Sequence, residues 1–364
     1  MNEEFYAFWL SFCTRVPLGK LWKSVNQLGS MEALYYAKEK ELSLFTEKEY
    51  AYIRQMKECQ GIRKLWEEQS KQDYQFLSYK NVLYPSKLLE LKEPPFGIYY
   101  QGKEEINPNS PVVGMVGARN CTIYGSEMAY RIARELGRQG IVVVSGLAAG
   151  IDGASHRGCL DGGGYTLGIL GTGIETIYPK ENYNLYLEMR KRGGILTEYP
   201  PETKPLPMLF PRRNRLISIL ADFILVVEAR EKSGSLITVD FALEQGRDVG
   251  VVPGRPCDAL SMGCNRLLQQ GAKCILTPED VMEAVLDSGR FVNCKTEKPK
   301  VNTDLGLAPK EKMVYSCLRL EPQFIDDILC QLKLSVWEGI QILTELEIKG
   351  IIKQNPHHYY YRVQ

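Results

Sequence analysis

The chain has 364 residues, too many for one hydrophobic core, and its 45 basic and 44 acidic side chains exclude a generally basic nucleic-acid-binding protein. Ten cysteines without a C-x-x-C pair, beside only three histidines, disfavour a disulfide framework or a zinc site and are typical of a reducing compartment. No stretch approaches the roughly 18 apolar residues of a membrane span and no signal-peptide pattern follows Met1, so we expect a cytoplasmic protein of two or three domains without membrane contact, metal or cofactor.

Residues 1–80 have the spacing of amphipathic helices and almost no β-branched runs. A helix start is indicated at Thr46, because Glu49 follows three residues later and the pair can form a capping box. We therefore predict a small helical domain whose aromatic side chains form a core. A helix–turn–helix or hairpin module for nucleic acid is the alternative, although the segment mixes Glu and Lys without a basic face. The aromatic stripe comprises Phe5, Phe8, Trp9 and Phe12.

Residues 112–152 predict the unit around which the rest of the chain is arranged. An apolar run at 112–116 breaks at Gly117, an amphipathic segment follows, and a second apolar run at 141–144 ends in the small residues 145–150. This pattern is typical of a βαβ unit with parallel strands. Small residues after each strand leave backbone N–H groups at the helix starts free to face an anion, and Arg119 adds a positive charge. The unit therefore predicts a phosphate site.

Strand and helix continue to alternate through residue 287, with further strands predicted near 166–170, 194–199, 223–228 and 249–252. Alternation of this kind predicts an α/β fold, a doubly wound, mostly parallel Rossmann-like sheet over residues 81–287. The chain has no G-x-x-x-x-G-K-[ST] segment, and its first turn is not G-x-G-x-x-G. A P-loop nucleotidase and an ordinary dinucleotide site are therefore disfavoured.

Residues 210–215 form the strongest local basic patch, with three arginines in four positions at a helix start. Arginine forks suit phosphate oxygens, and a phenylalanine can stack on any base. We interpret Phe210 and these arginines as a binding surface. In the alternative interpretation Phe210 is a core residue and the arginines pair with neighbouring acids.

Two further helix starts are candidate anion sites. Lys180 lies near a predicted helix N-terminus, where a lysine is mildly unfavourable unless an anion also binds there; otherwise it is a solvated surface charge. The segment 232–235, Lys-Ser-Gly-Ser, is a second loop of small residues that leads into a helix.

The segment 288–308 mixes polar residues, proline and glycine without periodicity and is predicted to be a linker. Residues 309–364 predict three helices followed by a hairpin, the order of a winged helix. Its third helix, 335–348, would enter a major groove, but its outer positions carry mainly glutamates, which repel phosphates. We therefore expect this domain to contact protein or to regulate, and not to bind duplex DNA.

From residue 84 to the C-terminus the chain resembles the bacterial DNA-processing protein A (DprA/Smf) family. Five ordered motifs carry the resemblance, and together they are specific. Where the family usually has Gly-Ser-Arg, this chain has Ala118, which removes a hydroxyl donor but keeps the arginine. The motifs are 116–119, 145–152 with His156, 171–173 with 178–182, 210–215 and 232–238.

The resemblance implies a protein, not an enzyme, that binds single-stranded DNA without sequence preference and dimerises through its Rossmann-like domain. It also implies that the protein loads the recombinase RecA onto incoming strands during natural transformation, and that the N-terminal domain is of the sterile-alpha-motif type. By position, Arg119, Lys180, Phe210 and the 213–215 turn match the family's DNA-binding pocket. The candidate DNA-binding residues are Gly117, Arg119, Ser145, Gly146, Ala148, Lys180, Phe210, Arg212, Arg213, Asn214, Arg215, Ser233, Gly234 and Ser235.

Two rival interpretations remain open. The central domain is more distantly similar to nucleoside-phosphate ribohydrolases, in which His156, Asp152 and Glu175 could supply acid–base chemistry. The glycine-rich loop of that group ends in a catalytic glutamate, and this acid is missing from its place in residues 234–240. The other rival is an interaction scaffold whose loops bind no ligand.

Overall fold

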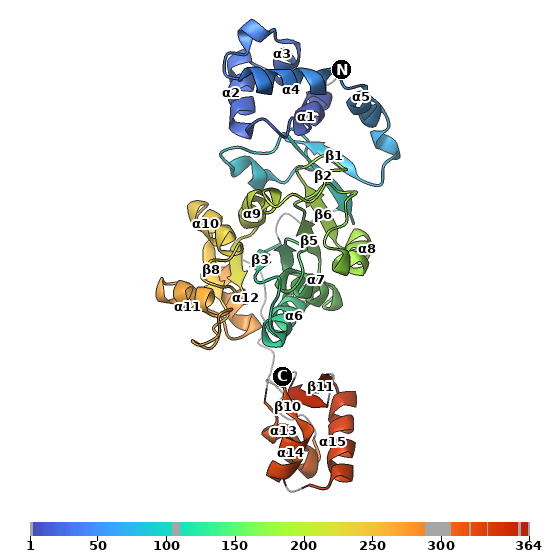
Figure 1. Ribbon diagram of the computed structural model, residues 1–364, viewed down its shortest axis with the longest axis vertical. Helices are drawn as coiled ribbons and strands as arrows, with labels where there is room; N and C mark the ends of the chain where they lie inside the picture. The colour runs from blue at the N-terminus through green and yellow to red at the C-terminus, as the bar shows by residue number, and fades with distance from the viewer. Residues whose placement is uncertain are drawn as a thin grey trace. The chain divides into compact units, whose positions relative to one another are not determined.

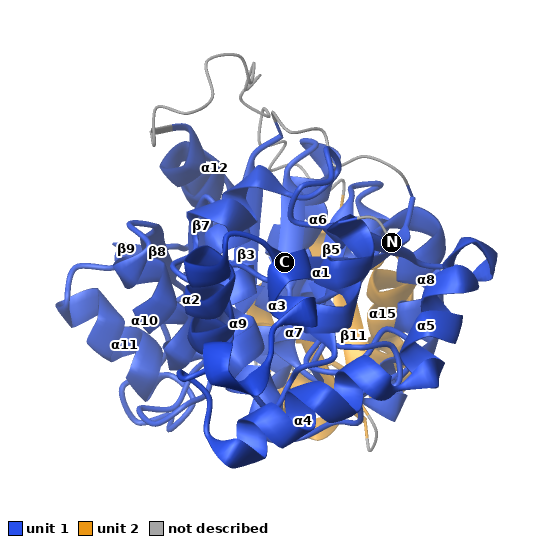
Figure 2. Ribbon diagram, turned by 90° about the horizontal axis from the view of Figure 1, so that it is seen from above, with its two compact units in different colours: residues 1–292 blue, residues 293–364 orange. Residues whose placement is uncertain are grey.

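The computed structural model describes residues 3–103, 110–287, 307–319, 322–332, 334–355 and 358–362. The chain forms two compact units, residues 1–292 and residues 293–364, which are coloured separately in Figure 2. The predicted boundary at residue 80 does not separate two units. Residues 75–78 lie before that boundary, yet they form a strand of the central sheet, and the predicted linker 288–308 lies almost wholly outside the described residues.

The first unit is built on one large sheet, whose green and yellow strands run through the middle of Figure 1. Within the described residues the strand order is β1-β2-β6-β5-β4-β3-β7-β8-β9. Strands β3 to β9 pair in parallel, while β1 and β2 form an antiparallel edge. This confirms the predicted mostly parallel α/β fold. The strands are β1 (Gln75–Ser78), β2 (Gly97–Gly102), β3 (Val112–Val116), β4 (Val142–Ser145), β5 (Thr166–Ile169), β6 (Gly194–Thr197), β7 (Phe223–Val226), β8 (Asp248–Val251) and β9 (Lys273–Cys274).

Helices cover both faces of this sheet, which explains why its strands are continuous apolar runs. Successive side chains of β3 alternate between the faces: Val112 joins the core under α9, α10 and α11, while Val113 joins the core under α6, α7 and α12. The helices are α6 (Ile123–Arg138), α7 (Ile151–Asp161), α8 (Tyr183–Arg192), α9 (Leu209–Leu220), α10 (Leu236–Glu244), α11 (Met262–Gln269) and α12 (Pro278–Asp287).

The strand order reverses beside β3, because β4 lies on one side of it and β7 on the other. In open α/β sheets the crevice outside the carboxyl ends of the strands, at such a reversal, is where ligands bind. The loops after β3, β4, β5 and β7 and the start of α9 all meet this carboxyl edge. The fold therefore gathers the glycine-rich segments of the sequence at one edge.

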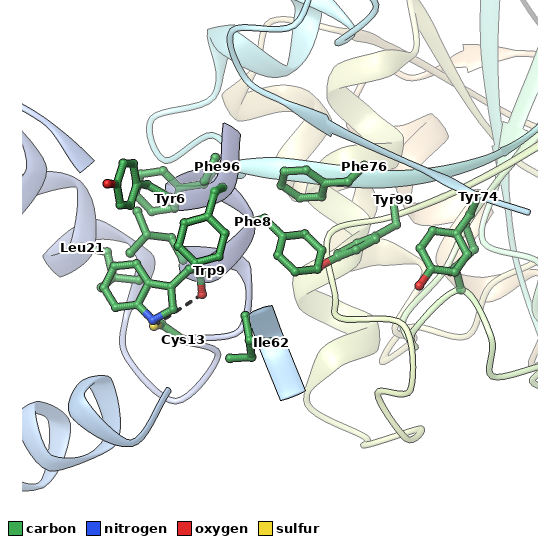
Figure 3. Packing of buried hydrophobic residues seen from close by; sticks show 14 of the residues in the cluster. Tyr6, Phe8, Trp9, Cys13, Leu21, Ile62, Tyr74, Phe76, Phe96 and Tyr99 are labelled. Atoms are coloured by element: carbon green, nitrogen blue, oxygen red, sulfur yellow. Dashed lines mark hydrogen bonds between the residues drawn. The ribbon is translucent and has the colours of Figure 1, made fainter. Parts of the chain in front are cut away.

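The N-terminal helices share a core with the antiparallel edge of the sheet (Figure 3). The Phe8 ring lies 5.1 Å from that of Phe76 in β1 and 6.0 Å from that of Tyr99 in β2. The prediction that these aromatics are core residues is confirmed, as is the capping box between Thr46 and Glu49. The helices are α1 (Glu3–Ser11), α2 (Leu18–Leu28), α3 (Met31–Tyr36), α4 (Glu47–Glu58) and α5 (Gln60–Glu67).

The second unit has its own small core around Leu343 and Leu346. Its elements follow the order predicted for a winged helix, and that classification stays a prediction. Outside this core the third helix exposes four large apolar side chains, of which Trp337 and Ile348 are the most exposed, at 82% and 81%; the other two are Val336 and Ile340. The elements are α13 (Pro309–Cys317), β10 (Gln323–Phe324), α14 (Ile325–Leu332), α15 (Val336–Ile348), β11 (Ile352–Asn355) and β12 (Tyr359–Arg362), with the antiparallel order β10-β12-β11.

Candidate nucleic-acid interface

Three side chains from three separate segments meet at the carboxyl edge of the sheet, and we call them the aromatic corner: Arg119, Tyr178 and Phe210. The guanidinium carbon of Arg119, in the loop after β3, lies 5.1 Å from the centre of the Phe210 ring at the start of α9. The Tyr178 ring, in the segment between β5 and α8, lies 5.5 Å from the Phe210 ring at an interplanar angle of 42°. Motifs that are 91 residues apart in the chain therefore touch.

Lys180 follows Tyr178 by two residues and opens the short helix η4 (Lys180–Asn182). Both Lys180 and Arg119 are exposed, and neither forms an ion pair with a described residue. The turn is held on the loop after β4, because the Asn182 side-chain amide donates to the carbonyl oxygens of Leu147 (3.1 Å) and Ala148 (2.8 Å). Arg119 in the aromatic corner and the neighbouring Lys180 are thus two exposed cations without an ion-pair partner among the described residues, and the Asn182 hydrogen bonds fix the backbone beside Lys180.

Arg213 faces the interior instead of the surface. Its side chain is only 3% exposed, and Nη1 donates to the carbonyl oxygens of Gly146 (2.8 Å) and Ile169. Burial lowers the pKa of this guanidinium to about 10, so it stays charged at neutral pH. A Cβ at Gly146 would clash with both Arg213 (2.4 Å) and the buried carboxylate of Asp152 (2.6 Å), so both groups pack against the same side of this glycine. Arg213 therefore ties the start of α9 to the ends of β4 and β5.

The other two arginines of the basic patch differ from each other. Arg215 donates to Glu198 at 2.5 Å, and their side chains are 13% and 7% exposed; it also donates to the carbonyl oxygen of Glu93. Arg215 therefore pairs with a neighbouring acid, as the alternative interpretation of this patch expected. Arg212 is half-buried and lies beside Glu198 and Tyr199, on the side of the N-terminal helices. Neither arginine shares the corner with Arg119.

Carboxylates of the chain itself occupy the starts of two helices at this edge. Glu228 accepts from the backbone N–H of Thr122 (2.8 Å) and from its hydroxyl, just before α6. Asp152 Oδ2 accepts from the N–H groups of Gly146 (3.1 Å) and Ala148 (3.4 Å), just before and within the turn into α7. The expectation that these amides are free to face an external anion is therefore wrong for Gly146 and Ala148. Burial raises the pKa of Asp152, which its neighbours partly offset.

Two other predicted residues have structural roles in the loops. The hydroxyl of Ser145 is fully buried and donates to the carbonyl oxygen of Met115 at 2.5 Å, which joins β4 to β3. A Cβ at Gly117 would lie 2.6 Å from an atom of Ile151, so the loop after β3 can approach α7 only with a glycine there. Neither residue presents a side chain to a ligand.

The loop after β7 lies beside the start of α9. The Asn214 side-chain amide donates to the carbonyl oxygen of Gly234 at 3.3 Å, and the hydroxyls of Ser233 and Ser235 are 2.7 Å apart. Gly234 is exposed, with no atom within 4 Å of a Cβ built on it. Within this loop Gly234 is therefore open to solvent, whereas the predicted site residue Ser235 is buried.

The residues of the rival enzyme each have an internal partner. His156 is fully buried, and its Nδ1–H donates to Thr166 Oγ1 at 2.6 Å, because that hydroxyl donates its own proton to Val143. Burial lowers the pKa of His156 to about 3. Asp152 is held by backbone amides, and Glu175 is exposed, with Tyr74 and Glu202 nearby. His156 is therefore not accessible to a substrate as a general base.

We expect the buried imidazole of His156 to make the protein less stable in mild acid. Its pKa lies below the ordinary value of 6.5, so the unfolded chain binds a proton that the folded chain cannot. The free energy of unfolding should fall by up to about 1.4 kcal/mol per pH unit as pH drops below 6.5. Urea unfolding at pH 7 and pH 5 checks this: His156→Leu should lose less stability than the wild type, and equal losses would contradict it.

Within the described residues, no three His, Cys, Asp or Glu side chains are arranged to hold a metal ion. Nor does that part of the chain contain a helix long and apolar enough to cross a membrane.

The family model described as DNA recombination-mediator protein A matches residues 75–286. The DNA processing protein DprA of Bacillus subtilis is 44% identical over 200 residues, 55% of this chain and 67% of the relative. The solved DNA processing protein A of Streptococcus pneumoniae is 30% identical with a TM-score of 0.65, over 78% of this chain and 98% of that one. A Helicobacter pylori DNA processing protein A, solved to explain how it binds single-stranded DNA, is 29% identical with a TM-score of 0.54, over 59% and 96%.

Proposed function

Because the chain belongs to the DNA recombination-mediator protein A family, we propose that it binds single-stranded DNA without sequence preference at the aromatic corner. The observation that carries this proposal is the contact between Arg119 and Phe210 with Tyr178, beside the free cation of Lys180. The two cations bind backbone phosphates, and an aromatic ring stacks on a base. The single-stranded DNA binding mode described for the Helicobacter pylori relative supports the same ligand.

Unpaired strands suit this corner better than duplex does. Every base has a π-face, so stacking accepts any sequence, but in a duplex these faces are covered by neighbouring base pairs. The exposed face of α15 in the second unit offers no compensating duplex site, because Trp337 and Ile348 are apolar and Glu345 and Glu347 repel phosphates. Duplex affinity should therefore be lower.

The biological role follows from the family. We propose that the protein acts in the cytoplasm as a homodimer and loads the recombinase RecA onto DNA strands taken up in natural transformation. The family description, a recombination mediator, supports a recombinase partner, and the DNA-processing names of the relatives support the process. Purified RecA tests the partnership directly. Strand exchange by RecA on single-stranded DNA should accelerate when the protein is added.

Salt titration of oligo-dT binding tests the ligand. Phosphate contacts release counterions, so the affinity should fall linearly on a log–log plot against salt. Lys180→Ala should weaken binding and lower the slope by about 0.7, the value for one phosphate contact on a single strand. Lys191→Ala, which removes an exposed lysine from the last turn of α8, is the matched control. Equal binding of oligo-dT and matched duplex, or a wild-type slope in Lys180→Ala, would overturn the proposal.

A further inference from the structure

Helix α15 of the second unit is apolar on two opposite faces. Its inner face is buried in the core of the unit through Leu343 and Leu346. Residues three and four positions apart share a face of a helix, so the outer face also has a row of apolar side chains. We call this row the outer stripe: Trp337, Ile340 and Ile348, which are 82%, 39% and 81% exposed. A helix that is apolar all round is normally buried on every side, so this helix has one face without a partner among the described residues.

The outer stripe belongs to a helix that is anchored along its length. At its start, the Ser335 hydroxyl accepts from the backbone N–H of Glu338 and donates to the carboxylate of the same residue. One turn later, Gly339 lies so close to Leu329 of α14 that an added Cβ would overlap it. The exposed side chains are therefore held in one arrangement before any partner binds, which lowers the entropic cost of association.

The charges beside the outer stripe are all negative. The helix contains three glutamates and neither lysine nor arginine. Glu338 pairs with Lys310 at 3.1 Å, whereas Glu345 and Glu347 are exposed and form no ion pair with a described residue. Because successive helical residues are about 100° apart, Glu347 lies along one edge of the stripe and Glu345 along the other. The stripe is therefore an apolar row between two uncompensated carboxylates.

This pattern selects among possible occupants. A nucleic acid or an anionic lipid surface would bring further negative charge, and helices that lie on membranes have lysine and arginine beside their apolar face. A second copy of α15 would place glutamates against glutamates without a cation between them. The complementary surface is an apolar row that has cations on both sides.

We infer that the outer stripe of α15 binds an amphipathic helix of another protein, whose apolar row is bordered by lysine or arginine. Trp337 is the apolar anchor of this contact, because exposed tryptophan is the side chain that most often dominates an interface. Glu345 and Glu347 select the partner, as charges beside the seam do in paired helices. The second unit thereby gains a protein-binding role that goes beyond the proposed function and does not depend on it.

Two designed peptides of about 20 residues, long enough to form a helix, test the full-length protein. Both have leucine at positions a and d of each heptad; the lysine peptide has lysine at e and g, and the glutamate peptide has glutamate there. In fluorescence anisotropy the wild type should bind the lysine peptide, more weakly as salt rises, and not the glutamate peptide. Trp337→Ala should weaken binding by about 30-fold or more, the size of an interface hot spot. A wild type that binds neither peptide, or both alike, would overturn the inference.

Reversal of the two charges is the sharper measurement. The double variant Glu345→Lys/Glu347→Lys should prefer the glutamate peptide. Its matched control, Glu67→Lys/Glu244→Lys, changes the net charge equally at exposed residues in the last turns of α5 and α10. The control should keep the wild-type preference. If the first double variant also keeps it, the carboxylates beside the stripe do not select the partner.

The emission of Trp337 shows whether the stripe is open before the peptide binds. Taken as the difference between the wild type and Trp337→Phe, this emission should be quenched by iodide in the protein alone and should shift to shorter wavelength with the lysine peptide. A Trp337 already shielded from iodide would mean that this chain covers its own stripe, against the inference. Trp337→Ala should unfold at the wild-type urea concentration and retain oligo-dT, whereas loss of oligo-dT would assign the stripe to DNA. A wild type that binds the lysine peptide but not oligo-dT would remove only the proposed function.

Discussion

Arg119→Ala is expected to weaken binding to oligo-dT by about 10- to 100-fold, because a charged hydrogen bond contributes about 1.5–3 kcal/mol. The slope of affinity against salt should also fall by about 0.7, since one phosphate contact is lost. Arg119→Lys should restore the slope but only part of the affinity, because an ammonium cannot bind phosphate through two parallel N–H groups. Fluorescence anisotropy at several salt concentrations measures both quantities.

Arg54→Ala is the control for this variant. Arg54 is an exposed arginine on α4 that pairs with Glu58 one helical turn away, so its loss removes the same charge from the chain outside the aromatic corner. It should leave affinity and slope unchanged. If Arg54→Ala and Arg119→Ala have the same slope, the effect belongs to net charge and not to the corner.

The second large effect concerns stability. Arg213→Met should lower the free energy of unfolding by roughly 3–5 kcal/mol, the usual cost of leaving a buried charge, here the Asp152 carboxylate, without a compensating charge nearby. The substitution leaves the carbonyl oxygens of Gly146 and Ile169 without their donor and Asp152 without a nearby positive charge. Urea unfolding at pH 7 gives the magnitude.

The pH dependence of this loss has a defined sign. Without Arg213 the pKa of Asp152 rises further above its ordinary 3.8, so the folded chain binds a proton more readily than the unfolded chain. The deficit of Arg213→Met should therefore shrink as pH falls from 7 toward 3.8. Arg212→Met, the neighbouring and half-buried arginine, is the matched control and should cost little. Equal deficits in the two variants would contradict the buried role of Arg213.

The apolar runs predicted the sheet well, because strands buried on both faces need continuous apolar sequence. They also predicted that Arg119, Lys180 and Phe210 share an edge, since parallel strands bring all their carboxyl ends together. The direction of each arginine in 212–215 was harder to predict. Successive helical residues point about 100° apart, so three arginines in four positions cannot share one surface. Phe210 and Arg213, three residues apart, face the loops, while Arg212 and Arg215 face the other way.

The occupation of the helix starts by carboxylates of the chain could not be predicted from the sequence either. Glu228 accepts from Thr122, which precedes it by 106 residues, so no local pattern connects the two. Tyr178 was missed because its signal, an aromatic just before a proline and a lysine in a loop, also suits a packed residue. Its exposure and its contact with Phe210 depend on how α9 docks on the loop after β5. Contacts between segments that are far apart in the chain therefore determine both features, and no local sequence pattern predicts them.

Under the proposed function, Glu228 and Asp152 also favour a nucleic-acid strand over small phosphorylated metabolites. A nucleoside triphosphate that approaches this edge finds two helix starts already neutralised, and it gains only a pair of exposed cations. A polymer gains contacts one after another along its length, each at the high effective concentration set by the one before. For the proposed function, the built-in acids therefore favour a long strand over a single nucleotide.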